Sequence, residues 1–175
     1  MLQLNTRAVL AVVATGVALF MLSGCGLLEA RQAEAVANQG IQLQKFIEQA
    51  DAWGADIVAQ VPAPEASQIS ENIGGSRQAG ANYEEWPKYY YWSQIVELHP
   101  DARTPTEFAD GLEPWLEEQG WERNIDSGSS PGKESFVRSY SRGRYSLAVE
   151  IYTVSPPQAQ SLNFSIVSPD TDPNS

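Results

Sequence analysis

Apolar and small residues recur every three or four positions between residues 27 and 60, a segment that contains no proline. This spacing places them on one stripe of an α-helix. The stripe comprises Val36, Gly40, Leu43, Ile47, Ala50, Gly54, Ile57 and Val61. Pro62 and Pro64 lack amide hydrogens and end the pattern. We therefore predict an amphipathic helix whose first turns form a stalk and whose later turns pack on a domain.

Residues 65–86 are rich in Gly, Ser and Asn and have only scattered apolar side chains. They predict a long loop, with a short helical turn near residues 67–73 as a variant. The following segment, KYYYWSQIVEL from Lys88 to Leu98, is aromatic and β-branched, which predicts a strand. Alternation along that strand places Tyr90, Trp92, Val96 and Leu98 on one face, and Tyr89, Tyr91, Ser93 and Ile95 on the other.

A second helix is predicted from a capping signal. Thr104 fits the N-cap, Pro105 the first helical position and Glu107 the reciprocal acid of a capping box. The helical stripe that follows is Phe108, Leu112, Trp115 and Leu116. Because Pro114 removes an interior hydrogen bond, we expect a kink near residues 110–111 or two short helical pieces.

After Gly120 the pattern changes to a period of two, which is typical of strands. The predicted strands are residues 121–126, 134–141, 144–154 and 161–168. Arg142 and Gly143 are expected to form a two-residue hairpin turn, and residues 169–175 a disordered tail. This order of elements predicts an α+β domain over residues 65–168, with an antiparallel sheet and its helices on one face.

The N-terminal region has the pattern of an export signal. Arg7 is followed by 15 uncharged, mostly apolar residues, Ala8 to Leu22. As a helix this run would rise about 22 Å, which is short for a hydrocarbon core of about 30 Å but typical of a signal peptide.

Leu22-Ser23-Gly24-Cys25 resembles the lipobox of bacterial lipoproteins at all four positions. The resemblance implies that residues 1–24 are a signal peptide that is cut off, and that Cys25 becomes the first mature residue and carries a diacylglyceryl group. Residues 25–64 would then comprise the lipidated cysteine and the amphipathic helix. The alternatives are an ordinary export signal and a short membrane anchor, with an incidental cysteine in either case.

The charge and the scarcity of Cys and His exclude several functions. The chain has 22 acidic and 11 basic side chains, and loss of Arg7 with the signal would leave 10 basic ones and a net charge of −12. That surplus argues against nucleic acid as a partner. A single Cys excludes an internal disulfide and a Cys-based zinc site, and the single His, His99, is predicted in a turn. With no catalytic motif present, we expect no enzyme, no cofactor and no metal.

Aromatic residues gather before and within the predicted strand that begins at Lys88. Tyr83, Trp86, Tyr89 and Tyr91 form a candidate recognition surface, because aromatic side chains stack on sugars and anchor protein partners. The alternative is that these rings are core or covered by the second helix. A pocket lined by Tyr90, Trp92 and Trp115 would instead indicate a binder of small ligands.

Arg138, Arg142 and Arg144 flank the predicted hairpin and form a candidate anion patch. Glu134 and Glu150 lie on the same strands and could neutralise it. We expect the arginines mainly to keep the hairpin soluble and to balance nearby acids, so that Ser in place of Arg142 and Arg144 would not change binding to cell wall or to anionic vesicles.

Beyond the lipobox, the stretch TPTEFADGLEPWLEEQGW leading into a strand meander resembles small uncharacterised actinobacterial lipoproteins of the LppA-like kind. The resemblance implies a place in the cell envelope and no particular activity. Together these features predict a lipid-anchored protein on the extracytoplasmic face of the cell membrane, held there through Cys25. It would be non-enzymatic and would bind an envelope protein or a wall polymer. The alternative is a lipoprotein that binds a small glycan, lipid or peptide.

Overall fold

The computed structural model describes residues 6–78, 85–124, 135–153 and 159–174, with side chains from residue 28 onward except at Gln78. The elements are α1 (Thr6–Val58), β1 (Ala66–Ile69), β2 (Gly75–Gln78), β3 (Lys88–Leu98), α2 (Pro105–Glu118), β4 (Glu122–Arg123), β5 (Ser135–Arg142), β6 (Tyr145–Tyr152) and β7 (Ser161–Val167).

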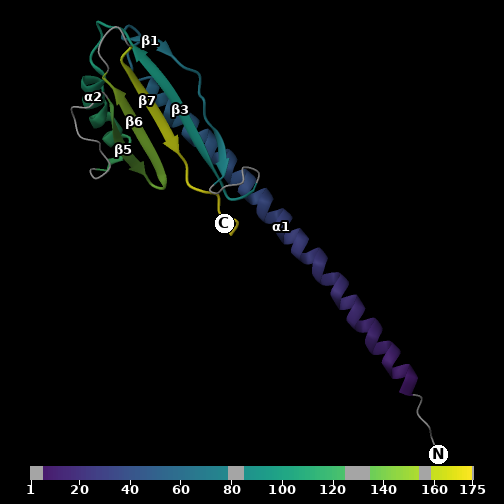
Figure 1. Ribbon diagram of the computed structural model, residues 1–175. Coiled ribbons are helices and arrows are strands. Elements are labelled where there is room, and N and C mark those ends of the chain that lie inside the picture. The colour runs from purple at the N-terminus through teal and green to yellow at the C-terminus, as the bar shows by residue number, and fades with distance from the viewer. Residues whose placement is uncertain (1–5, 79–84, 125–134, 154–158, 175) are drawn as a thin grey trace, which may run out of the picture.

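The described strands form one antiparallel sheet of seven strands in the order β1-β3-β7-β6-β5-β4, with β2 also paired to β3. Both helices lie on the same side of the sheet, and α1 continues far beyond it (Figure 1). Helix α1 packs on β3 and β7, and α2 packs on β6 and β4. The predicted α+β fold with helices on one face is therefore confirmed.

The segment predicted as a long loop instead forms the edge of the sheet. β1 and β2 both pair with β3, so the alternative prediction of a helical turn near residues 67–73 is wrong. Between the two strands, Ser70 N–H donates to the carbonyl of Ile95 at 2.9 Å, and Ile73 N–H donates to that of Ser93 at 3.1 Å. Gly, Ser and Asn have low strand propensity, so it is pairing with the long strand β3 that orders them.

The predicted capping box at the start of α2 is confirmed. Thr104 Oγ1 accepts from the Glu107 N–H at 3.2 Å, and Glu107 Oε2 accepts from the Thr104 N–H at 2.9 Å. The helix is continuous to Glu118 through Pro114, so the expectation of two short pieces is wrong. The apolar stripe buries Phe108, Leu112 and Leu116, and this burial outweighs one missing hydrogen bond in an exposed turn. Pro105 and Ala109 of α2 are buried as well.

The hairpin turn is shifted by one residue from the prediction. Arg142 pairs with Tyr145, so the two turn residues are Gly143 and Arg144. Gly143 has φ of +59° and occupies the first turn position, as in a type II′ turn, whereas no non-glycine residue of the described chain has a positive φ.

The stripe predicted on α1 is buried only in its second half. Ala50, Gly54 and Ile57 are buried against the sheet, whereas Val36 is 46% exposed. Gly54 allows this close approach, because a Cβ atom there would lie 2.2 Å from Cε2 of Trp92. An edge-to-face cluster also joins α1 to the β5–β6 hairpin, with 5.0 Å between the ring centroids of Trp53 and Tyr145. No helix in the described residues is long and apolar enough to cross a membrane.

Residues 169–174, predicted as a disordered tail, are packed against the domain. Thr171 is 3% exposed, and its N–H donates to the carbonyl of Lys88 at 2.9 Å. Hydrogen bonds and not apolar side chains hold this segment in place. The hydrophobic pattern of the sequence therefore could not predict its packing.

Replacing Gly54 with Ala tests the close contact between α1 and β3. The new methyl group would overlap the buried indole of Trp92, so we expect the free energy of unfolding to fall by about 1–3 kcal/mol. Gly40→Ala is the matched control, because a Cβ at Gly40 meets no atom within 4 Å. It should stabilise the protein by up to about 1 kcal/mol through helix propensity. Urea denaturation measures both, and equal effects of the two variants would contradict the packing described here.

Candidate binding face of the sheet

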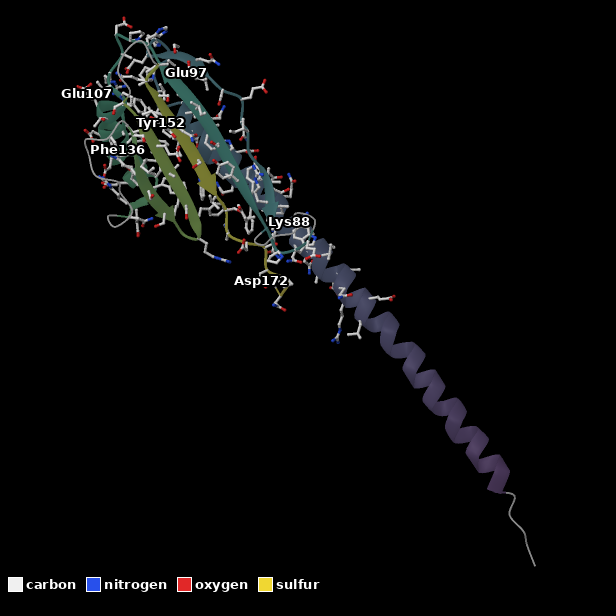
Figure 2. All side chains as sticks on the ribbon, in the orientation of Figure 1. Lys88, Glu97, Glu107, Phe136, Tyr152 and Asp172 are labelled. Atoms are coloured by element: carbon white, nitrogen blue, oxygen red, sulfur yellow. The ribbon has the colours of Figure 1, made fainter. Side chains whose placement is uncertain are left out.

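The face of the sheet that points away from the helices consists mainly of small and hydroxyl-bearing side chains. Strand alternation and register place Tyr89, Tyr91, Ser93, Ile95, Glu97, Ser161, Asn163, Ser165, Val167, Ser146, Ala148, Glu150, Tyr152, Ser135, Val137, Ser139 and Ser141 on it, with Arg77 beside Tyr89. We call these residues the open face. Glu97 and Tyr152, labelled in Figure 2, lie in one row across the strands.

The open face has a row of small residues between taller neighbours. Ser93, Ser165, Ala148 and Ser139 face one another across β3, β7, β6 and β5. The row on one side begins with Tyr91, and the row on the other contains Asn163 and Glu150. The hydroxyl of Ser165, a residue that is 7% exposed, has no hydrogen-bond partner among the described residues.

A hydrogen-bonded chain fixes the polar side chains beside this row. Ser93 Oγ donates to Asn163 Oδ1 at 2.9 Å, and Asn163 Nδ2 donates to Glu150 Oε2 at 3.0 Å. Tyr152 Oη donates to the same carboxylate oxygen at 2.8 Å, and this bond is the main reason why the pKa of Tyr152 is raised. The second oxygen of Glu150 accepts no hydrogen bond from the described residues, so it is available to a donor from outside.

The structure brings together only part of the predicted recognition surface. Tyr89 and Tyr91 lie half-buried on the open face, as the strand alternation predicted. Trp86 precedes β3, and Lys88 Nζ lies 5.1 Å from the centroid of its ring. Tyr83 lies outside the described residues.

Among the described residues, Tyr90, Trp92 and Trp115 do not line a common pocket. Tyr90 and Trp92 are 7% and 2% exposed and are packed in the core with α1. Trp115 lies elsewhere, on α2, beside a cavity of about 80 Å³ that neither of the other two rings lines. The layer between α1 and the sheet is therefore filled.

Arg138 is not part of an exposed anion patch, in contrast to the prediction. Its side chain is 9% exposed and pairs with Asp110 and, at 3.3 Å, with Glu113 of α2. These two acids are three residues apart on the helix and so reach the same guanidinium. Of the neutralising acids that the sequence suggested, Glu150 lies on the open face and not beside Arg138, and Glu134 is outside the described residues.

The other two arginines, Arg142 and Arg144, have different surroundings from Arg138 and from each other. The guanidinium of Arg142 lies 4.4 Å from the centroid of the Trp53 ring, which makes it a structural contact of α1. Arg144 is exposed in the hairpin turn. Only Arg144 fits the expected role of a solvated surface charge.

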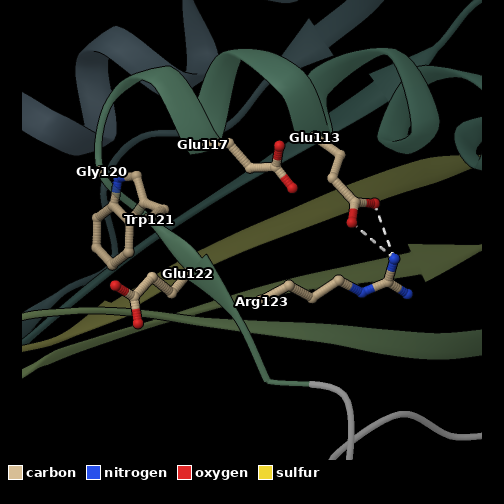
Figure 3. A pocket seen from close by; sticks show the side chains of 6 residues that line it. All are labelled: Glu113, Glu117, Gly120, Trp121, Glu122 and Arg123. Atoms are coloured by element: carbon tan, nitrogen blue, oxygen red, sulfur yellow. Dashed lines mark hydrogen bonds and ion pairs between the residues drawn. The ribbon is translucent and has the colours of Figure 1, made fainter.

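A hollow of about 740 Å³ lies where α2 ends and β4 begins, lined by Glu113, Glu117, Gly120, Trp121, Glu122 and Arg123 (Figure 3). Both oxygens of Glu113 accept from Arg123 Nη1 at 2.8 Å, which raises the pKa of Arg123. Sequence reasoning missed this hollow, because no local pattern marks the place where α2 and β4 meet. Among the described residues no group of His, Cys, Asp or Glu could hold a metal ion.

Comparisons of the chain with protein-family models, with curated proteins and with solved structures find no match.

Replacing Arg138 with Leu tests the ion pairs that this buried arginine makes with α2. Asp110 and Glu113 would lose a shared cation, and we expect the free energy of unfolding to fall by about 1–3 kcal/mol. The loss stays below that of a fully buried pair because Asp110 is 62% exposed. Arg144→Ser is the control and should change stability by less than about 0.5 kcal/mol. Equal stabilities of the two variants in urea denaturation would refute the role given to Arg138.

Proposed function

We propose that this chain is a lipid-anchored, non-enzymatic protein on the extracytoplasmic face of a bacterial cell membrane, and that its domain binds a wall glycan through the open face. The observation that supports the anchoring is the course of α1. This helix runs without a break from the region of the lipobox-like sequence into the domain. Its side chains are exposed from residue 28 to residue 38, except the half-buried Ala35, and Gln39 is the first buried one.

The exposed part of α1 has the dimensions of a spacer. Fourteen residues separate Cys25 from Gln39, a rise of about 21 Å along a helix. The mature chain would carry a net charge of −12 and be repelled by anionic lipid. Because that repulsion is screened within about 8 Å at physiological salt, a spacer of this length holds the domain beyond its range. Two acyl chains on Cys25 would suffice for stable anchoring.

The chemistry of the open face favours a glycan over a protein partner. Among its described residues it has no Trp, Phe or Met, and its only aromatic residues are Tyr89, Tyr91 and Tyr152, which can serve sugars as well as proteins. Its accessible serines, such as Ser146 and Ser161, match the hydroxyl groups of a sugar. Asn163 and the Glu150 oxygen that accepts no bond from the described residues do so as well, and Tyr91 offers a ring to stack on. The acidic surplus of the chain disfavours an anionic polymer, so a neutral glycan fits best.

The anchor is tested by replacing Cys25 with Ala. The native protein should incorporate a palmitate analogue during growth, and its processing should stop in the presence of globomycin. Cys25→Ala should show neither property, because the thiol that accepts the lipid is gone. A Cys25→Ala protein that is processed and remains membrane-bound to the same extent as the native protein would overturn lipid anchoring.

The open face is tested with a Tyr89→Ala and Tyr91→Ala double variant of the full protein in detergent micelles. We expect about tenfold weaker binding to purified, uncharged wall polysaccharide, because two stacking rings are lost. Arg144→Ser is the control and should bind like the native protein, since Arg144 is exposed in the turn and is not on the open face.

Unchanged polysaccharide binding by the double variant would exclude the open face as the glycan site. If the native protein instead captures one envelope protein and the double variant does not, the partner is a protein and the glycan proposal is wrong.

A further inference from the structure

The segment that follows β7 extends the sheet and then reaches α1. Ser168 N–H donates to the carbonyl of Tyr90 at 2.9 Å, and Ser168 Oγ accepts from the Tyr90 N–H at 2.8 Å. Thr171 repeats this arrangement with Lys88, where the distances are 2.9 Å and 3.0 Å. The segment therefore lies along the first residues of β3.

Two glutamines of α1 receive the end of this segment. The side-chain amide of Gln42 pairs with the backbone of Asp172 in both directions, with Nε2 donating to the carbonyl at 2.8 Å and Oε1 accepting from the N–H at 2.9 Å. One turn earlier, Gln39 Nε2 donates to Thr171 Oγ1 at 3.4 Å, and both residues are 3% exposed. Gln39 is thus a buried polar residue of α1 whose partner lies 132 positions away in the chain.

These contacts lie where α1 leaves the domain. In Figure 1 the last described residues reach the side of α1 close to the point where the helix passes beyond the sheet. Toward the N-terminus the side chains of the helix are exposed. Toward the C-terminus its core-facing side chains are partly buried at Leu43 and Phe46 and fully buried from Ala50. The contacts with residues 171–172 are therefore the outermost fastening of the helix.

The fastening is polar, whereas the contacts of α1 with the core further along the helix are mainly apolar, with Asp51 Oδ1 accepting from Tyr90 Oη at 2.8 Å as a further polar contact. Residues 169–174 read PDTDPN and contribute no large apolar side chain to the core. Hydrogen bonds of this kind are exchanged for bonds to water at a small net cost, whereas the contacts of Ala50, Gly54 and Ile57 open only with the core. The outer fastening can therefore open locally while the domain stays folded.

We propose that residues 168–174 are a releasable clasp that sets the length of the free stalk. With the clasp closed, α1 is held from Gln39 onward. With it open, the first core contacts begin at Leu43, and the free stalk lengthens by four residues, or about 6 Å. The height and tilt of the open face above a membrane would change accordingly, and this consequence alone rests on the proposed lipid anchor.

Hydrogen–deuterium exchange of the full protein in detergent micelles tests the clasp. The variant combines Gln42→Ala with Thr171→Val, which removes the amide and hydroxyl that make the contacts and keeps the shape of the threonine. We expect at least tenfold faster exchange of the amides of residues 39–46, and unchanged exchange of residues 50–58.

The matched control is Gln44→Ala on the exposed side of the same helix, where Gln44 contacts only Glu48 among the described residues, at 3.0 Å. It removes a glutamine from α1 without touching the clasp, so exchange at residues 39–46 should match that of the native protein. Exchange that is unchanged in the clasp variant, or that rises equally in the control, would overturn the proposal. Faster exchange throughout residues 39–58 would also overturn it, because the segment would then be part of the core rather than a local clasp.

The same exchange measurement, with the clasp variant and its control made in the Cys25→Ala protein, tests the clasp independently of the lipid anchor. The clasp contacts involve no lipid, so this protein should show the same contrast between the clasp variant and its control. If the contrast appears while lipid labelling fails, the anchor is wrong and the clasp stands. If labelling succeeds and the contrast is absent, the clasp is wrong and the anchor stands.

Discussion

The contact between Gly54 of α1 and the indole of Trp92 in β3 sets the distance between the helix and the sheet. No side chain larger than hydrogen fits between them, so the helix backbone lies directly on the ring. Ala50 and Ile57, one turn to either side, then reach the core, and Trp53 reaches the hairpin on the other side of the helix. The two-layer arrangement depends on this contact, because a bulkier residue would lift α1 away from β3 and expose the apolar side of the strand.

Once one face of the sheet is covered by helices, the other face has a different chemistry. Strand alternation sends Tyr90 and Trp92 into the core and Tyr89 and Tyr91 to the open face. The same alternation takes Arg138 inward, where α2 presents Asp110 and Glu113 to it. These ion pairs lock α2 onto β5, and the open face keeps hydroxyls and amides. A largely polar surface results, and hydrogen bonds hold Ser93, Asn163 and Glu150 in place on it.

Helix α1 serves two purposes along its length. Its C-terminal half is a core element, and the stretch before Gln39 is a spacer exposed to solvent. The boundary between the two is made by polar contacts with residues 171–172, not by the apolar stripe. The exposed stretch of α1 thus ends at contacts with residues that are remote from it in sequence.

The sequence by itself determined the elements whose signals are local. The capping box at Thr104 and Glu107, the strand from Lys88 to Leu98 and its division into two faces were all predicted, because each depends on spacing within a few residues. Only the tertiary structure decided the rest. β1, β2 and residues 169–174 have compositions typical of loops. They are ordered by backbone hydrogen bonds to β3, which is distant from residues 169–174 in sequence. The partners of Arg138 and of Gln39 are likewise distant in the chain, at Glu113 and Thr171. Contacts of this kind leave no periodic trace in the sequence, because a buried polar group needs one correctly placed partner and not a repeating pattern.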